Sequence, residues 1–295
     1  MHRDMDGEPG MRELDEAQIA HLSKNIVIPP RPAVLLKLQQ IKNDPNADLA
    51  QLAHVINQDV SLAGTLLKAA NSPFYALSKR ISSVGQAVTV LGTRNVIQLT
   101  TGIALQNAIG NGQGLSLERF WDSAMHVAQI SALLAPRFTD LSPDECYSFG
   151  LFRDCGIPVM LLRYPDYKDT MALANQEADS RFPEIEDARH HTNHVSIGYL
   201  VARSWLLPDD LAQAILLHHD HHCIGHGHGY APPHVASLIA IARLAEHISA
   251  GMLRLSDDVG WNSCQDIILD FLGINEAEIQ DLSDPIIARL QGDTP

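Results

Sequence analysis

Apolar residues follow the period of an α-helix along almost the whole chain. Val34, Leu35, Leu38 and Ile41 share one helical face, and the same spacing recurs in most later segments. No stretch of any length alternates apolar and polar residues as a strand would. The expected helices cover 49–56, 62–70, 84–91, 96–108, 116–135, a segment from 142, 193–205, 208–219 and 233–250, with two shorter ones in 264–291. The pattern predicts an all-α, multi-helix bundle with short connections.

Polar and glycine-rich segments divide these helices. Ser82-Ser83 is a capping signal before 84–91, and Gly92 marks a turn before the next helix. The clearest internal break is Asn111-Gly-Gln-Gly114. It separates a purely helical first half from a second half that carries nearly all the unusual chemistry. Residues 1–20 are expected to form a polar tail and a lead-in helix.

The composition narrows the class of protein. The chain has 295 residues, with 21 basic against 35 acidic side chains and a net charge of −14. This sign disfavours a general binder of nucleic acid or anionic membranes. The four cysteines form no CxxC pair, and no uninterrupted run of about 18 apolar residues occurs. We therefore expect a cytoplasmic protein with free thiols.

Two adjacent charges, Arg153 and Asp154, lie inside the apolar run 149–162. Burying a charge is costly unless it is paired or coordinated. Neighbours on a helix point about 100° apart, so we expect each of the two to find a partner elsewhere. Pro158 removes the amide that would bond the Asp154 carbonyl, which predicts a kink in the helix there. The run predicts a polar site built into a core.

Histidines are concentrated in the second half, with ten of the 15 between His190 and His234. His194 falls in the first turn of its helix, where an imidazole is disfavoured as a cation and can bind metal when neutral. His218 shares the inward helical face with Leu211 and Ile215, and His219 points to one side of that face. Each also has an ordinary alternative, as an exposed histidine or a hydrogen-bonded core residue.

The remaining polar segments have simpler interpretations. His126 lies in a stripe with Asp122 and Gln129, which is either a solvated helix face or the lining of an internal site. The Gly-rich loop containing His221, His222, His226 and His228 is expected to be flexible and solvated. The acidic run 184–187 is interpreted as a solvated helix face. The sequence has no phosphate-binding glycine loop, GxSxG or HExxH motif.

Several of these segments resemble the HDOD family, the signalling relatives of the HD metal-dependent phosphohydrolases. The resemblance covers about residues 25–222, and residues 223–295 form a His/Gly loop and a helical extension beyond it. The segments that carry it are Ile28-Pro-Pro-Arg-Pro32, Ile56-Asn-Gln-Asp-Val60, Leu66-Leu-Lys-Ala-Ala-Asn71-Ser72, Ala87-Val-Thr-Val-Leu-Gly92, Trp121 to His126, Phe149 to Gly156, His194 with Gly198 and Leu200, Trp205-Leu-Leu-Pro208 and His218-His219. It implies an HD-like architecture in which a helical N-terminal half packs on a degenerate HD-type half.

The resemblance also implies a set of metal ligands. In catalytic HD enzymes one histidine, a His-Asp doublet, further histidines and a late aspartate hold one or two metals. The residues that match are His126, Asp154, His194, His218 and His219. Arg153 stands in place of the doublet histidine and cannot ligate a metal, because its guanidinium does not lose its proton. The late acid falls at best on Glu246.

These features lead to a preferred hypothesis and its alternatives. We expect a non-catalytic bacterial signal-transduction module that contacts other signalling proteins, with a vestigial metal pocket blocked by Arg153 and no cofactor. The alternatives are a residual single-metal phosphohydrolase or phosphodiesterase, holding one divalent transition metal, and a module that senses a nucleotide or a metal. Residues 223–295 are expected to cover the pocket, mediate self-association or dock a partner.

Overall fold

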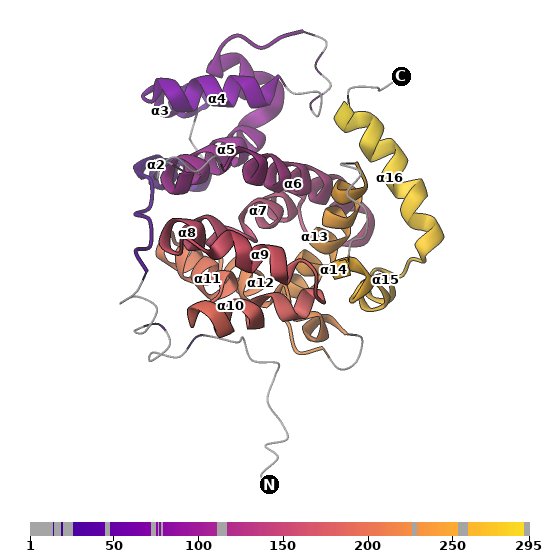
Figure 1. Cartoon of the computed structure of the whole chain (residues 1–295). Coiled ribbons are helices and arrows are strands. Elements are labelled where there is room, and N and C mark those ends of the chain that lie inside the picture. The colour runs from indigo at the N-terminus through magenta and orange to yellow at the C-terminus, as the bar shows by residue number, and fades with distance from the viewer. Residues whose placement is uncertain are drawn as a thin grey trace. The chain divides into compact units, whose positions relative to one another are not determined.

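The computed structural model describes residues 26–44, 48–71, 79–110, 117–225, 229–252 and 259–291, with single positions at 14, 19, 75 and 77. Over these residues the chain forms α-helices and two short 3-10 helices, η2 and η3, and no strand (Figure 1). The predicted all-α class is therefore confirmed. The expected tail and lead-in helix of residues 1–20 and the break at 111–114 lie outside the described residues, apart from Leu14 and Ile19.

The chain divides into two compact units. One is built mainly from Pro29–Asp122 and includes the chain from Gln280, and the other is built mainly from Ser123–Ile279. The described residues between 223 and 279, which lie beyond the resemblance, belong to the second unit, and their helices pack with its other helices. The predicted site residues from His126 onward all lie in this second unit.

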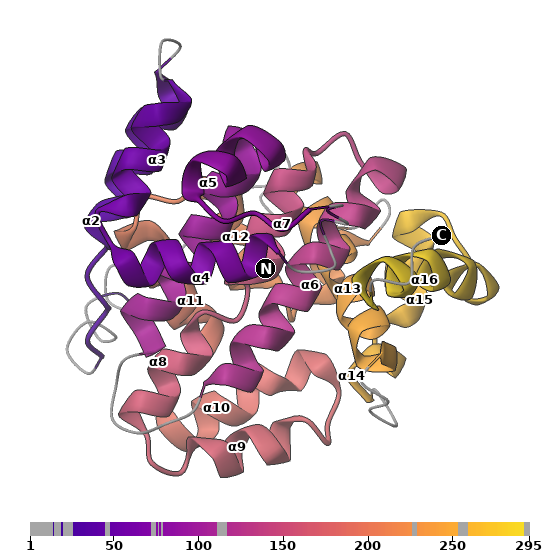
Figure 2. The same cartoon turned by 90° about the horizontal axis from the view of Figure 1, so that it is seen from above.

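The first unit is organised around one long helix, α5 (Figure 2). Its helices are α2 (Ala33–Asn43), α3 (Leu49–Asn57), α4 (Val60–Ala70) and α5 (Val84–Gly110). The side chains of Asp48 and Asp59 cap α3 and α4 by accepting from the backbone amides of Gln51 and Leu62. The turn expected at Gly92 is present as a kink within α5, where glycine adopts φ 83°.

The second unit contains most of the helices. They are α6 (Glu118–Phe138), which begins in the first unit, α7 (Pro143–Phe152), α8 (Gly156–Arg163), α9 (Tyr167–Ala174), η2 (Asp179–Arg181), α10 (Phe182–His190), α11 (His194–Ser204), α12 (Asp209–Leu217), η3 (His221–Ile224), α13 (Pro233–Met252), α14 (Val259–Asn262), α15 (Gln265–Leu272) and α16 (Glu276–Gln291), which ends in the first unit. Within this unit α11 packs on α8 and α12, and α13 packs on α7, α12 and α15.

Glycines allow α8 and α11 to approach closely. An ideal Cβ on Gly156 would lie 2.0 Å from the backbone oxygen of His194, and one on Gly198 would lie 2.8 Å from the side chain of Ile215. Only glycine fits the first position, because a backbone atom cannot move aside as a flexible side chain can. This close approach brings the turn that carries Asp154 beside the first residue of α11.

Helix α13 is the one helix in the described part of the chain that is long and apolar enough to cross a membrane. In its most apolar stretch 67% of the residues are buried within the fold. A core helix of a folded domain has this same composition. Its burial among α7, α12 and α15 accounts for its apolar character.

Candidate metal centre

A turn between α7 and α8 presents the two adjacent charges. Helix α7 starts with a capping box formed by Ser142 and Glu145 and ends at Phe152, and α8 starts at Gly156. The predicted kink in one continuous helix is therefore wrong. Pro158 is the third residue of a new helix, where its missing amide costs little. The Asp154 carbonyl accepts a hydrogen bond from the amide of Ile157 at 2.9 Å instead.

Arg153 is buried and fully paired. Its Nη2 lies 3.0 Å from Asp154 Oδ2, its Nη1 donates to the Gly150 carbonyl, and its Nε donates to Glu246 on α13. Each of the two charges finds a partner elsewhere, as expected, in Glu246 and His218, but the expectation that they do not pair with each other is wrong, because they lie in a turn rather than on a helix. Burial alone would lower the pKa of Arg153, but the negative charges of Asp154 and Glu246 raise it by more. The net pKa is raised, so the guanidinium keeps its charge.

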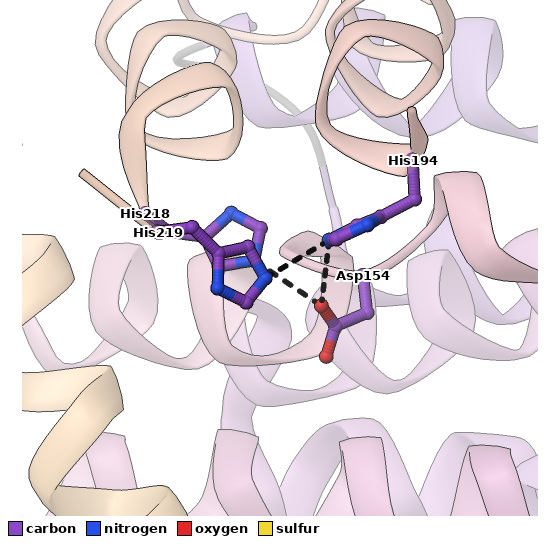
Figure 3. A group of neighbouring side chains, drawn as sticks. All are labelled: Asp154, His194, His218 and His219. Carbon is purple, nitrogen blue, oxygen red and sulfur yellow. Dashed lines mark hydrogen bonds and ion pairs between the residues drawn. The ribbon is translucent and has the colours of Figure 1, made fainter. Parts of the chain in front are cut away.

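Four side chains from three segments converge next to this turn: Asp154, His194, His218 and His219. One potential ligand atom from each lies within 4.8 Å of all the others (Figure 3). The Asp154 Oδ1 atom is 3.3 Å from His218 Nε2 and 3.7 Å from His194 Nε2. The Nε2 atoms of His194 and His219 are 3.2 Å apart. Four of the five residues expected from the sequence are thus brought together.

Each imidazole in this group is held by its other nitrogen. His194 Nδ1 lies 2.7 Å from Glu186 Oε2, His218 Nδ1 lies 2.9 Å from the Ile215 carbonyl, and His219 Nδ1 lies 2.8 Å from Asp179 Oδ2. Carbonyl and carboxylate oxygens only accept, so each Nδ1 donates. In the neutral imidazoles the lone pairs are therefore on Nε2 and face one another. The Nε2 of His218 is buried with no hydrogen-bond partner in the described structure.

The donor set fits one transition-metal ion. A tetrahedral ion with bonds of about 2.0–2.1 Å has ligand atoms about 3.3–3.4 Å apart. The Asp154 Oδ1–His218 Nε2 distance of 3.3 Å and the His194 Nε2–His219 Nε2 distance of 3.2 Å lie close to this value, and the Asp154 Oδ1–His194 Nε2 distance of 3.7 Å is longer. Three imidazoles and a carboxylate are ligands that suit zinc or iron, whereas magnesium and calcium take oxygen ligands. Asp154, His194, His218 and His219 would hold the ion.

The protonation states of Asp154, His218 and His194 are set by burial and by the charged side chains beside them. Burial raises the pKa of Asp154, but Arg153 and then His218 outweigh it, so the carboxyl stays ionised with a pKa well below its usual range. Burial and the neighbouring His219 lower the pKa of His218, which keeps it neutral. Burial alone would also lower the pKa of His194, but the negative charge of Glu186 raises it by more, so the net pKa of His194 is raised. The prediction that His194 has no tendency to become a cation was wrong, because a helix terminus is a weaker influence than an adjacent carboxylate.

His126 is not part of the 4.8 Å group. It lies on α6 with its side chain half-buried, and its Nδ1 is buried with no hydrogen-bond partner among the described residues. Gln129 of the same stripe is buried and Asp122 is exposed. The stripe is therefore neither uniformly solvated nor a complete lining of the pocket.

Sequence reasoning missed three residues near the group, two of them buried and one half-buried. Glu186 was expected on a solvated face, but its exposure is 0% because it shares the inner face of α10 with Phe182 and His190. The spacing of four residues between these three positions was the available signal. His221 was expected in a solvated loop, but it lies buried in η3, and His226 and His228 lie outside the described residues. Its Nε2 is 2.7 Å from Asp179, a residue that no motif marked.

Hydrogen bonding to Asp179 also sets the charge of His221. Burial lowers the pKa of this imidazole, but the bond to Asp179, together with Cys264, raises it to about 9. The Asp179 carboxyl is held well below its usual pKa, because His219 and His221 outweigh the effect of burial. Asp179 therefore stays ionised between the two histidines.

Asn193 fixes the start of α11 and with it the position of His194. Its Oδ1 accepts from the Ser196 amide at 2.9 Å, as the sequence predicted for a cap. We expect Asn193→Ala to lower the free energy of unfolding by about 1 kcal/mol, measured by chemical denaturation. Asn193→Ser keeps a capping oxygen and is the control. Equal losses in both variants would contradict the role of the cap.

A sequence model of the HDOD domain matches residues 28–221, so the chain belongs to the HDOD family. A curated relative from Treponema pallidum (strain Nichols), of uncharacterized function, is 26% identical over 196 residues. That match covers 65% of this chain but only 38% of the relative, so the chain spans well under half of the relative's length.

Solved structures share the fold. A protein from Shewanella amazonensis SB2B, whose name proposes a phosphohydrolase, has a TM-score of 0.69 at 20% identity and covers 96% of this chain and 99% of its own. A protein from Marinobacter aquaeolei VT8, whose name proposes a role in signal transduction, has a TM-score of 0.68 at 23% identity over 96% of this chain and 61% of its own. At these identities the likeness establishes the HD-like helical fold alone.

Proposed function

We propose that this protein is a non-catalytic, cytoplasmic regulatory module of bacterial signal transduction, and that its HD-type pocket binds one divalent transition-metal cation as a structural or sensed ligand. From the sequence we preferred a vestigial pocket without a cofactor and kept one bound divalent transition metal as an alternative. The proposal adopts that alternative for the pocket. Its support is the set of Nε2 lone pairs facing Asp154 Oδ1. When bound, such an ion supplies positive charge and holds its ligands together.

The observation that carries the non-catalytic part is the pairing of Arg153. Its guanidinium binds Asp154 Oδ2 and Glu246 Oε1, two carboxylate oxygens that a second cation would need, and Arg243 binds Glu246 Oε2. Arg153 is buried and stays charged, so it repels another cation at that place. The pocket is thereby restricted to a single metal.

The number of ligands supports the same conclusion. Asp154 and the three histidines provide four protein ligands, which is the complete set of a structural zinc site. Catalytic zinc sites have three protein ligands and an open position for water or substrate. For a tetrahedral zinc ion this ligand set leaves no position at which a bound water could be activated. These residues would therefore hold the ion without presenting it to a substrate.

The first unit offers surface for a protein partner. Val60 and Val90 are 84% and 57% exposed, and Leu49 lines a groove between α3 and α5 together with Ala53 and Thr89. Of these three exposed apolar residues only Leu49 lines the groove, and an apolar residue exposed at a groove is a feature of interaction sites. The signal-transduction name of the Marinobacter protein agrees with this proposal.

Replacing Arg153 with histidine tests the proposal. We expect the wild type to hold one equivalent of metal and to hydrolyse neither a phosphodiester nor a cyclic dinucleotide with zinc, manganese or iron added. Arg153→His releases Asp154 Oδ2 and Glu246 and adds an imidazole, so it is expected to bind close to two equivalents. Elemental analysis and a steady-state hydrolysis assay provide the two measurements.

Arg189→His is the matched control, because Arg189 is an exposed arginine whose ion pair with Asp166 is 3.4 Å long. It should leave the metal content unchanged. Steady hydrolysis by the wild type would refute the non-catalytic assignment. Two equivalents in the wild type would refute the assignment of Arg153 as the group that excludes a second cation.

A further inference from the structure

Two carboxylates that belong to no family motif lie directly behind the pocket. Glu186 on α10 and Asp179 on η2 each contact the Nδ1 of a ligand histidine, on the side away from the other ligands. Glu186 has an exposure of 0%, and the Asp179 side chain is 14% exposed. Burying a carboxylate is costly, so each requires a partner that repays the loss of water.

The Glu186 carboxylate is fixed by three hydrogen bonds. Its Oε2 accepts from His194 Nδ1 at 2.7 Å and from the His194 backbone amide at 3.1 Å. Its Oε1 accepts from the hydroxyl of Tyr167, which is itself fully buried. The backbone and side chain of His194 are thus held by the same oxygen. The ring has little freedom to turn its Nε2 away from Asp154.

Asp179 plays the corresponding part for His219. Its Oδ2 accepts from His219 Nδ1 at 2.8 Å and from His221 Nε2 at 2.7 Å. Its own backbone amide donates to Ser263 Oγ at 3.1 Å, which ties η2 to the segment before α15. The carboxylate is therefore anchored on both sides and sets the orientation of the His219 ring.

These contacts decide which nitrogen of each ring can ligate a metal. A carboxylate that accepts from Nδ1 keeps the proton there, so the lone pair of the neutral ring is on Nε2. It also makes that nitrogen a stronger donor to a cation. The Nε2 atoms of His194 and His219 are 3.2 Å apart, a hydrogen bond in which one of them carries a proton, and a cation bound between them would replace that proton.

We propose that Glu186 and Asp179 are the positioning residues of the metal centre, which hold His194 and His219 in the orientation and tautomer that ligate through Nε2. This inference rests on the proposed function, because it assigns a role toward the cation bound there. It predicts that the charge of either carboxylate affects metal affinity, although neither touches the ion.

The test measures zinc affinity by competition with a chromophoric chelator. Glu186→Gln keeps the side-chain volume and its amide oxygen can still accept from His194, so it removes the charge and the acceptor for the Tyr167 hydroxyl, whose oxygen can accept from the amide nitrogen instead. We expect its zinc affinity to be about 10-fold weaker than that of the wild type. Glu184→Gln, on the same helix with a side chain 72% exposed, is the matched control and should bind zinc like the wild type.

The melting temperature of the metal-free protein separates positioning from folding. If Glu186 had a merely structural role, Glu186→Gln would lower the melting temperature of the metal-free protein. If Glu186 positions His194, the variant binds zinc more weakly while its metal-free melting temperature stays near the wild-type value. Should Glu186→Gln fail to fold, Asp179→Asn decides the matter by the same two measurements. Wild-type zinc affinity in the deciding variant would overturn this inference alone. A wild type that binds no zinc would overturn the proposed function and this inference with it.

Discussion

Gly156→Ala is expected to lower the free energy of unfolding by about 3 kcal/mol or more. A Cβ at this position would lie 2.0 Å from the His194 backbone oxygen and 2.9 Å from the Gly198 amide nitrogen. Backbone atoms cannot rotate away, so α8 and α11 would have to separate, and overpacking of this kind is at the costly end of its range. Chemical denaturation followed by circular dichroism measures the loss.

Gly251→Ala is the control for this prediction. Gly251 is an exposed residue near the end of α13, and a Cβ there would meet nothing within 4 Å. Alanine favours a helix over glycine by up to about 1 kcal/mol, so this variant should be as stable as the wild type or slightly more stable. Similar stabilities for both alanine variants would show that α8 and α11 do not lie as close as described.

Glu246→Ala is expected to cost about 3 kcal/mol of unfolding free energy. It removes the carboxylate that accepts from Arg153 Nε and leaves a buried guanidinium with Asp154 and the Gly150 carbonyl alone. Breaking a buried ion pair by deleting one partner is strongly destabilising, because the remaining charge has already lost its water. The same denaturation measurement applies.

Glu246→Gln is the graded control, since its amide oxygen can still accept from Arg153. We expect it to lose about 1 kcal/mol, because it keeps a hydrogen bond and gives up the charge. An alanine variant as stable as the glutamine variant would mean that Arg153 does not depend on α13. Glu246, which lies beyond the family match, would then play no part in holding Arg153 beside the pocket.

The helices were predictable because their signals are local. Apolar spacing located α5 and α11, the Gly92 kink interrupted α5 where glycine was expected, and Asn193 caps α11 as its sequence position suggested. Caps and apolar periodicity depend on residues within a few positions of one another. Such features can therefore be predicted without knowledge of the tertiary structure.

The site was only partly predictable because its contacts join distant segments. Asp154 and His218 stood out as polar residues in apolar surroundings, but Glu186 lay within an acidic run that looks like a solvated face. Its burial follows from the position of α10 beside His194, which the local sequence does not specify. Asp179 was missed for the same reason, since its partners are 40 and 42 residues away.

The sequence did not predict that Arg153 pairs with Asp154, because the local pattern favours one continuous helix. Helical geometry would have separated the two side chains, and the apolar run 149–162 favours a helix. A second helix instead starts at Gly156, with Pro158 as its third residue, and the intervening turn brings Arg153 Nη2 to 3.0 Å from Asp154 Oδ2. The resemblance had singled out Arg153 and, more weakly, Glu246, but did not predict that the two bind each other.

Elemental analysis of the full chain, purified without a histidine tag and after dialysis against zinc, tests the central claim most directly. The account predicts close to one equivalent of zinc in the wild type and a loss of that equivalent in His218→Ala, which removes the buried Nε2 that faces Asp154. A wild type free of zinc, or one that holds the same equivalent when His218 is replaced, would contradict it.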